Sequence, residues 1–142
     1  MERAIETLTL EEVVEINRQQ IAMFGGLFLP VSNFHNEASL EFALDAVDAV
    51  SYGRPLHPTL ADKAASLAYS IITNHVFRDG NKRTAMAVCR IFLLLNGCDL
   101  EMETEVVDQN ALNMAIAVAD GTAGREELTN WVRERMRPLE NR

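Results

Sequence analysis

One stretch of this 142-residue chain is apolar on nearly every side, and it constrains the fold more than any other. The apolar stretch begins after Ala85. It belongs to the segment NKRTAMAVCRIFLLLN, which predicts a helix from Asn81 to Leu95 or Asn96 and is followed by Gly97. The terminal glycine is typical of the end of an α-helix. Because a helix that is apolar all round must be covered by other elements, we expect this helix to be the central, most buried one.

Other segments carry apolar residues at helical spacing on one side, as the helices that cover a central helix do. The expected fold is therefore all-α: one compact domain over residues 1–142, with about six helices. The apolar loop 25–36 is expected to form a short extended flap, for which a small β-hairpin is one form, and residues 99–102 a short extended piece. The further helices are expected over about 9–24, 37–51, 59–75, 104–120 and 125–136.

Two of these helices have clear starting signals. Thr9 and Glu12 have the spacing of a capping box, in which each residue binds the backbone of the other. Thr59 can cap the third helix, with Asp62 near the positive end of its dipole. His75 is the position at which the apolar stripe of that third helix would continue, so we expect this histidine on the inner face of the helix.

The formal net charge of −8 and the pI near 4.8 argue against broad, nonspecific binding to nucleic acid, which depends on many cationic contacts to phosphate. The sequence has no run of the ~20 apolar residues that a membrane-spanning helix needs, and MERAIETLTL lacks the apolar core of a signal peptide. We therefore expect a cytoplasmic protein with no membrane association. Cys89 and Cys98 form no metal-binding pattern and are expected to be reduced thiols.

The segment HVFRDGNKR, from His75 to Arg83, places ionisable side chains in front of the central helix. The first N–H groups of a helix have no partners within the helix and, with the helix dipole, attract anions. Gly80 allows the backbone to approach a ligand closely, and Lys82 and Arg83 add positive charge beside it. Cations at a helix N-terminus oppose the dipole, so this arrangement predicts a compensating anion, most naturally a phosphate chain.

Two further residues fit phosphate chemistry. Asp79 would repel a phosphate unless Mg²⁺ lay between them, and Mg²⁺ is commonly held by one or two carboxylates and substrate phosphates. His75, with an ordinary pKa of ~6.5, can accept a hydroxyl proton near neutral pH. Together they predict phosphoryl or nucleotidyl transfer from a nucleotide. Taken singly, His75 could be a core residue, Asp79-Gly80 a turn, and Lys82 and Arg83 part of a solvated first turn.

HVFRDGNKR resembles the signature of the Fic/Doc family, whose death-on-curing (Doc) branch has the form HxFx(D/N)(A/G)NKR. LTLEEVVEIN, NEASLEFAL, FLLLNG and EELTNWV extend the resemblance over roughly residues 8–135. It implies a compact α-helical fold with the signature between two central helices. By resemblance, His75 is the general base, Phe77 the loop anchor and Asp79 the Mg²⁺ ligand, Gly80, Asn81 and Lys82 form the phosphate-binding loop, and Arg83 holds phosphates beside it.

The departures from the Fic form bear on the reaction. Fic enzymes usually transfer AMP to a protein hydroxyl and carry a second arginine three positions after the first, where this chain has Met86. Lys82 and the missing arginine are features of Doc toxins, which are kinases. The resemblance therefore implies transfer of the γ-phosphate of ATP, with Mg²⁺, to a protein hydroxyl. In that branch the target is a threonine of elongation factor Tu, and the partner is a Phd-like antitoxin.

Other functions remain open at this point. The same residues could transfer AMP or another part of a nucleotide, although Lys82 and Met86 argue against it. A helical binding module could keep the signature without activity, although a lapsed site should have lost one of its residues. Metal-dependent phosphohydrolysis of the HD type needs an adjacent His-Asp pair, and neither His35 nor His57 is followed by Asp.

Overall fold

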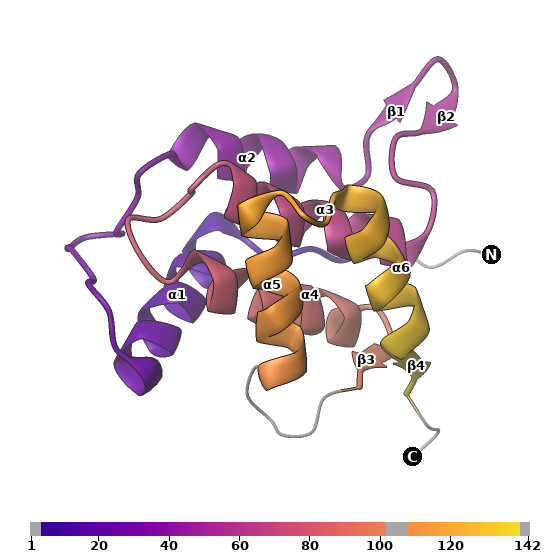
Figure 1. The fold of residues 1–142 in the computed structure, drawn as a ribbon. Coiled ribbons are helices and arrows are strands. Elements are labelled where there is room, and N and C mark those ends of the chain that lie inside the picture. The colour runs from indigo at the N-terminus through magenta and orange to yellow at the C-terminus, as the bar shows by residue number, and fades with distance from the viewer. Residues whose placement is uncertain (1–3, 102–107, 140–142) are drawn as a thin grey trace.

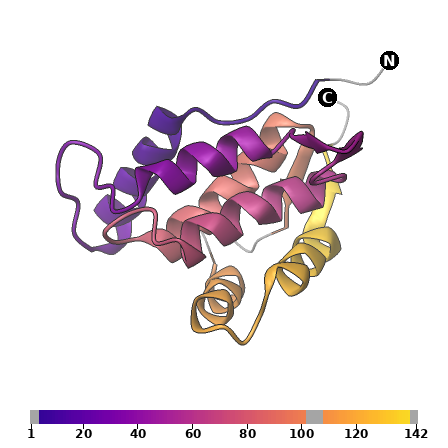
Figure 2. The ribbon, with the colours of Figure 1, turned by 90° about the horizontal axis from the view of Figure 1, so that it is seen from above.

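The computed structural model describes residues 4–101 and 108–139, and two helices, α3 and α4, lie at its centre. α3 packs against α2, α4, α5 and α6, and α4 also packs against α1 and α5. Figure 2 shows α1 and α2 on one side of this pair and α5 and α6 on the other. The elements, labelled in Figure 1, are α1 (Leu10–Phe24), α2 (Glu37–Ala46), β1 (Val50–Ser51), β2 (Arg54–Pro55), α3 (Leu60–Thr73), α4 (Asn81–Leu95), β3 (Cys98–Leu100), α5 (Gln109–Asp120), α6 (Arg125–Arg135) and β4 (Met136–Pro138).

One hydrophobic core joins all six helices. The inner face of α3 is rich in alanine, and its small side chains let neighbouring helices approach closely. α4 fills the space with larger groups such as Met86 and Phe92, both fully buried. The all-α fold predicted from the sequence is confirmed. α4 is central as expected, but it shares this position with α3, which contributes at least as many buried residues.

The strands form two small antiparallel hairpins. In β1–β2, Val50 pairs with Pro55 and Ser51 with Arg54, while β3–β4 joins the chain after α4 to the chain after α6. The extended piece expected near residues 99–102 is thus seen in part as β3, which ends at Leu100, and residue 102 lies outside the described residues. The loop 25–36 forms no hairpin: it contains a turn at residues 30–32 and a single bridge, between Phe34 and Phe77.

Several helix ends differ from the prediction. α2 ends at Ala46 instead of Ser51, because the chain turns into β1 and leaves Val50 64% exposed. α3 ends at Thr73, and His75 adopts a left-handed φ of 48° and lies at the surface. The expected inner-face position of His75 is therefore wrong. Its stripe ends with Ile72, and the turn after the helix directs the next residues elsewhere.

The C-terminal helices agree more closely. α5 begins at Gln109, capped by the side chain of Asp108; the part of the prediction that began near residue 104 lies outside the described residues. α6 ends at Arg135, one residue before the predicted Met136, which is the first residue of β4. No helix in the described part of the chain is long and apolar enough to cross a bilayer. Both cysteines are free thiols, as expected, and burial raises the pKa of Cys89 to about 12.

Candidate active site at the start of α4

The segment between α3 and α4 is a short, tightly held loop. The side-chain amide of Asn81 accepts a hydrogen bond from the N–H of Phe77 (2.9 Å) and donates one to its carbonyl (2.8 Å). The Phe77 ring is buried and stacks on Phe34, with 5.3 Å between ring centroids. The anchoring role expected of Phe77 is thus seen directly. Asn81, expected among the phosphate-binding residues, uses both polar atoms of its amide to hold the loop.

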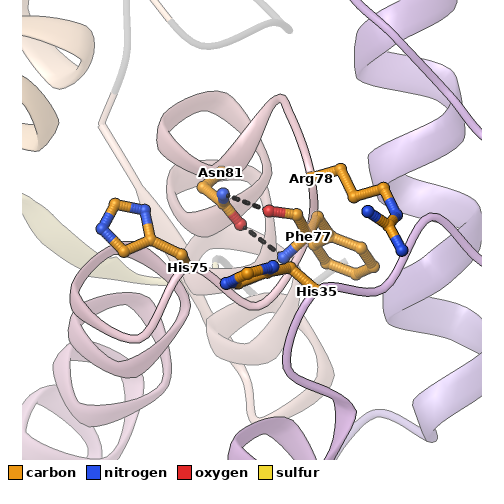
Figure 3. Close-up of a pocket in the computed structure, with 5 residues that line it drawn as sticks. All are labelled: His35, His75, Phe77, Arg78 and Asn81. Carbon is orange, nitrogen blue, oxygen red and sulfur yellow. Dashed lines mark hydrogen bonds between the residues drawn. The ribbon is translucent and has the colours of Figure 1, made fainter.

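His75 borders a pocket of about 420 Å³ together with His35, Phe77, Arg78 and Asn81. Figure 3 shows that the two imidazoles come from different loops, with His75 beside Asn81 and His35 beneath the Asn81–Phe77 hydrogen bonds. The interpretation of His75 as a core histidine is therefore excluded, since its side chain is available to a substrate. His35 was not predicted as a pocket residue, because no local pattern links residue 35 to residue 75. Arg78 was not predicted either, because it occupies a variable position of the signature.

The carboxylate of Asp79 faces the loop that follows α1. Its Oδ2 accepts the N–H of Leu27 and its Oδ1 the N–H of Gly80, both at 2.8 Å. A Cβ at Gly26 would lie 2.9 Å from Oδ2 and would displace the carboxylate from this position, and the φ of 128° itself favours glycine. Each carboxylate oxygen accepts one N–H and retains a lone pair, and the side chain is solvent-exposed.

This arrangement fits Mg²⁺ that arrives with a nucleotide. No group of three His, Cys, Asp or Glu residues suited to a metal occurs among the described residues, so that part of the chain offers no all-protein cage. Mg²⁺ tolerates that, because it is usually held by one or two carboxylates, substrate phosphates and water. Asp79 would hold such an ion, which would neutralise phosphate charge beside α4.

The N-terminus of α4 is open. Gly80, in the N-cap position with φ 76°, provides no side-chain cap, and the N–H groups of Asn81, Lys82 and Arg83 have no acceptor among the described residues. Side-chain oxygens serve as N-caps at four other helix starts: Thr9 for α1, Asn36 for α2, Thr59 for α3 and Asp108 for α5. α6 also starts at a glycine, Gly124, without a side-chain cap, but the carboxylate of Glu127 in its first turn accepts the Gly124 N–H (2.7 Å). An uncapped start with no acid in its first turn is a site for an anion.

The two cations of the signature are held differently. Lys82 is exposed and has no carboxylate partner in the described part of the chain. The guanidinium of Arg83 lies over the ring of Phe24, at the end of α1, 4.0 Å from the ring centroid. Such a contact holds the arginine beside the open helix start. Met86 is fully buried one turn further along, within the core.

The predicted residues thus lie around one helix start, but on two sides of it. His75 and Asn81 border the pocket that also contains His35. Asp79 and Arg83 face α1 and the residues just after it. Gly80 packs against α1, where a Cβ would lie 3.1 Å from the side chain of Ile21. The catalytic and binding roles assigned to these residues stay predictions.

Comparison with known proteins agrees with the signature. The family model described as Fic/DOC family matches residues 7–93, more than half of the chain. Toxin Doc of Mycolicibacterium smegmatis is 40% identical over 81 residues, which are 57% of this chain and 62% of that protein. The alignment thus spans less than two thirds of the curated relative. Since the family match includes the whole loop from His75 to Arg83 and both central helices up to residue 93, the chain belongs to the Fic/Doc family.

Proposed function

We propose that this protein is a Doc-type toxin that transfers the γ-phosphate of ATP to a hydroxyl group of a protein, by resemblance a threonine of elongation factor Tu. The observation that carries the proposal is the open, cationic start of α4 between an exposed histidine and an exposed carboxylate. The similarity to Toxin Doc, together with Lys82 and the uncharged Met86, supports phosphate transfer over AMP transfer.

In this proposal His75 accepts the proton of the target hydroxyl. The hydroxyl oxygen forms a bond to the γ-phosphorus of ATP, the bond to the β–γ bridging oxygen breaks, and ADP leaves with the electron pair of that bond. The unpaired N–H groups at the start of α4, with Lys82 and Arg83, stabilise the charge on the phosphates. Mg²⁺ held by Asp79 would neutralise further negative charge.

The proposed biological setting is a toxin–antitoxin system. A Phd-like antitoxin would restrain the toxin, and modification of elongation factor Tu in the cytoplasm would block translation. Expression of the chain alone should then slow bacterial growth, and His75→Ala should relieve the effect. Equal growth of both strains would argue against a toxin.

A label-transfer assay tests the reaction directly. Purified protein, Mg²⁺ and elongation factor Tu are incubated in parallel with γ-labelled and α-labelled ATP, beside His75→Ala. The proposal expects label on elongation factor Tu from γ-labelled ATP alone, lost in the variant. Label from α-labelled ATP would show AMP transfer instead. Label from neither, followed by a negative screen of a bacterial lysate, would favour a binding module without activity.

A further inference from the structure

A buried amide on α1, Asn17, connects the signature loop to the rest of the site. Its side chain is fully buried, and its Nδ2 donates both to the backbone carbonyl of Asp79 (2.9 Å) and to Oγ1 of Thr84 (3.0 Å). Its Oδ1 accepts a hydrogen bond from Nδ2 of Asn33 (3.0 Å). One side chain therefore joins α1, the loop 25–36, the signature loop and the first turn of α4.

Asn33 extends this connection into the loop 25–36. It is 2% exposed and adopts φ 60°, a conformation that Asn tolerates better than most residues. Its Oδ1 accepts the N–H of Leu29 (2.9 Å), and its carbonyl accepts the N–H of Arg78 (2.9 Å). The loop after α1 and the loop before α4 are thus held together by Asn33 from one side and Asn17 from the other.

Asn17, itself bonded by Asn33, holds the backbone carbonyl of Asp79, while the N–H of Leu27 holds the Asp79 carboxylate. Asp79 is consequently fixed at both ends by the same two segments, α1 and the loop that follows it. A buried network in which every polar group has a partner is rigid, and removal of one member leaves the others unpaired. Gly80 belongs to the same arrangement, because a Cβ there would lie 3.0 Å from Nδ2 of Asn17.

We propose that Asn17 is a positioning residue, which sets Asp79 in register with residues 26–29 so that its carboxylate can meet a metal–nucleotide complex. The magnesium part of this inference rests on the proposed function. The positioning part concerns the chain alone and can be tested without a ligand. Asn17 itself lies beneath the site and touches no substrate.

The first test is hydrogen–deuterium exchange of the protein without ligand. The N–H of Leu27 is a direct probe, since it lies at the surface and donates to Asp79. Asn17→Ala should make the amides of residues 26–29 and 77–80 exchange about tenfold faster, as expected for the loss of a contact of roughly 1.4 kcal/mol.

The matched control is Gln20→Ala. Gln20 lies one turn further along the buried face of α1 and is 8% exposed, but its Oε1 has no hydrogen-bond partner among the described residues. This variant loosens the same helix without removing a bond to the loop, so exchange at the two segments should stay near the wild-type rate. Equal exchange in both variants, or no change in Asn17→Ala, would overturn the inference.

The second test measures ATP binding as a function of Mg²⁺ concentration. Asn17→Ala should raise the Mg²⁺ concentration needed for half-maximal binding about tenfold, for the same loss of free energy, and leave metal-free ATP binding unchanged. If Asn17 had only a structural role, its loss would weaken metal-free ATP binding and Mg²⁺-dependent ATP binding in parallel. If the wild-type protein binds no ATP at any Mg²⁺ concentration, the proposed function fails, and the exchange experiment still decides the positioning role.

A second variant covers the case in which Asn17→Ala does not fold. Asn33→Gly keeps the left-handed backbone, because glycine adopts φ 60° without strain, but removes the amide that bonds Asn17. Its exchange at residues 77–80 should rise as in Asn17→Ala, a readout that excludes Leu29, whose N–H the Asn33 amide accepts directly. Tyr52→Gly is its control, since Tyr52 is fully exposed and also has a positive φ, of 51°, but lies in the β1–β2 hairpin.

Discussion

The two central helices begin in opposite ways. At α3, the hydroxyl of Thr59 accepts the N–H of Asp62 (3.1 Å), and the Asp62 carboxylate in turn accepts the N–H of Thr59 (3.1 Å). At α4, the N-cap residue is Gly80, which has no side chain, and the first three N–H groups have no acceptor among the described residues. The first helix start is closed by the chain itself, and the second is left open.

The charges differ in the same sense. The first turn of α3 contains the acid Asp62, whose negative charge interacts favourably with the positive end of the helix dipole. The first turn of α4 contains Lys82 and Arg83 and no acid. The histidines that precede the two helices differ as well: His57 is 8% exposed, and His75 is at the surface. The start of α3 therefore stabilises the fold, whereas the open start of α4 costs some stability, as expected if it serves the proposed nucleotide site.

The largest effect is expected from Gly80→Ala. The added Cβ would lie 3.0 Å from Asn17 and 3.1 Å from Ile21, at a φ of 76°. The shift of the loop should lower the rate of label transfer by more than about tenfold, because transfer depends steeply on geometry, and the free energy of unfolding by about 1–3 kcal/mol. Phosphate transfer and urea unfolding measure the two effects.

Gly97→Ala is the matched control for this change. Gly97 also has a positive φ, of 87°, but an added Cβ would meet nothing within 4 Å, so the substitution carries the backbone cost alone. Its transfer rate should equal that of the wild type. If both variants transferred phosphate equally well, the open start of α4 would not require a bare glycine.

The next effect is expected from Lys82→Ala. Loss of a charge-assisted contact to phosphate should weaken ATP binding about tenfold and reduce its dependence on salt. The free energy of unfolding should not fall, and a rise of a few tenths of a kcal/mol is expected, because a cation is removed from the positive end of a helix. Calorimetry at two salt concentrations and urea unfolding measure these quantities.

Arg125→Ala provides the comparison for Lys82→Ala. Arg125 is also an exposed cation in the first turn of a helix, α6, but it lies away from the signature. Its removal should leave ATP binding unchanged. Equal weakening of ATP binding in both variants would mean that only the overall charge matters and that α4 has no special start.

Local signals in the sequence predicted most of the helix starts and the residues that gather at the start of α4. The pairs Thr9–Glu12 and Thr59–Asp62 form the capping boxes that their spacing indicates. The signature from His75 to Arg83 marked the right helix start, because a glycine before two cations is a local pattern. These features depend on residues within a few positions of one another, which is the range that sequence patterns describe.

The errors and omissions depend on contacts between distant residues. Val50 and His75 continue apolar stripes in the sequence, but the helices α2 and α3 end before these two residues. The chain next to them instead makes hydrogen bonds outside the helices, from the Leu56 N–H to the Ala49 carbonyl and from the His35 N–H to the Val76 carbonyl. Asn17 lies 62 positions from Asp79 and stands alone in an otherwise ordinary helix. No periodicity could indicate its role, since a buried amide such as Asn17 or Gln20 is distinguished only by its partners.

Thr59→Ala tests the closed helix start. The variant leaves the N–H of Asp62 without its acceptor and should lower the free energy of unfolding by about 1 kcal/mol, with unchanged label transfer. Thr73→Ala, at the other end of α3, is the control: its hydroxyl donates to the Tyr69 carbonyl one turn back, a bond that adds little to helix stability. A loss of transfer in Thr59→Ala would show that the two helix starts are not independent.

The smallest effect concerns His57, just before α3. Desolvation, with Arg125 and Lys63 nearby, lowers the pKa of His57 below its ordinary 6.5, although Asp62 acts in the opposite direction. As the pH falls through 6.5, the unfolded chain therefore takes up a proton that the folded chain still excludes. The contribution of His57 to stability is fully present above this pH and is lost progressively as the pH falls toward the lowered pKa.

His57→Gln should consequently show a smaller decrease in the free energy of unfolding between about pH 7.5 and about pH 5.5 than the wild type. This pH window lies above the range in which most carboxylates titrate. Parallel pH profiles of the two proteins would contradict this, and would remove the buried histidine from the contrast between the closed start of α3 and the open start of α4.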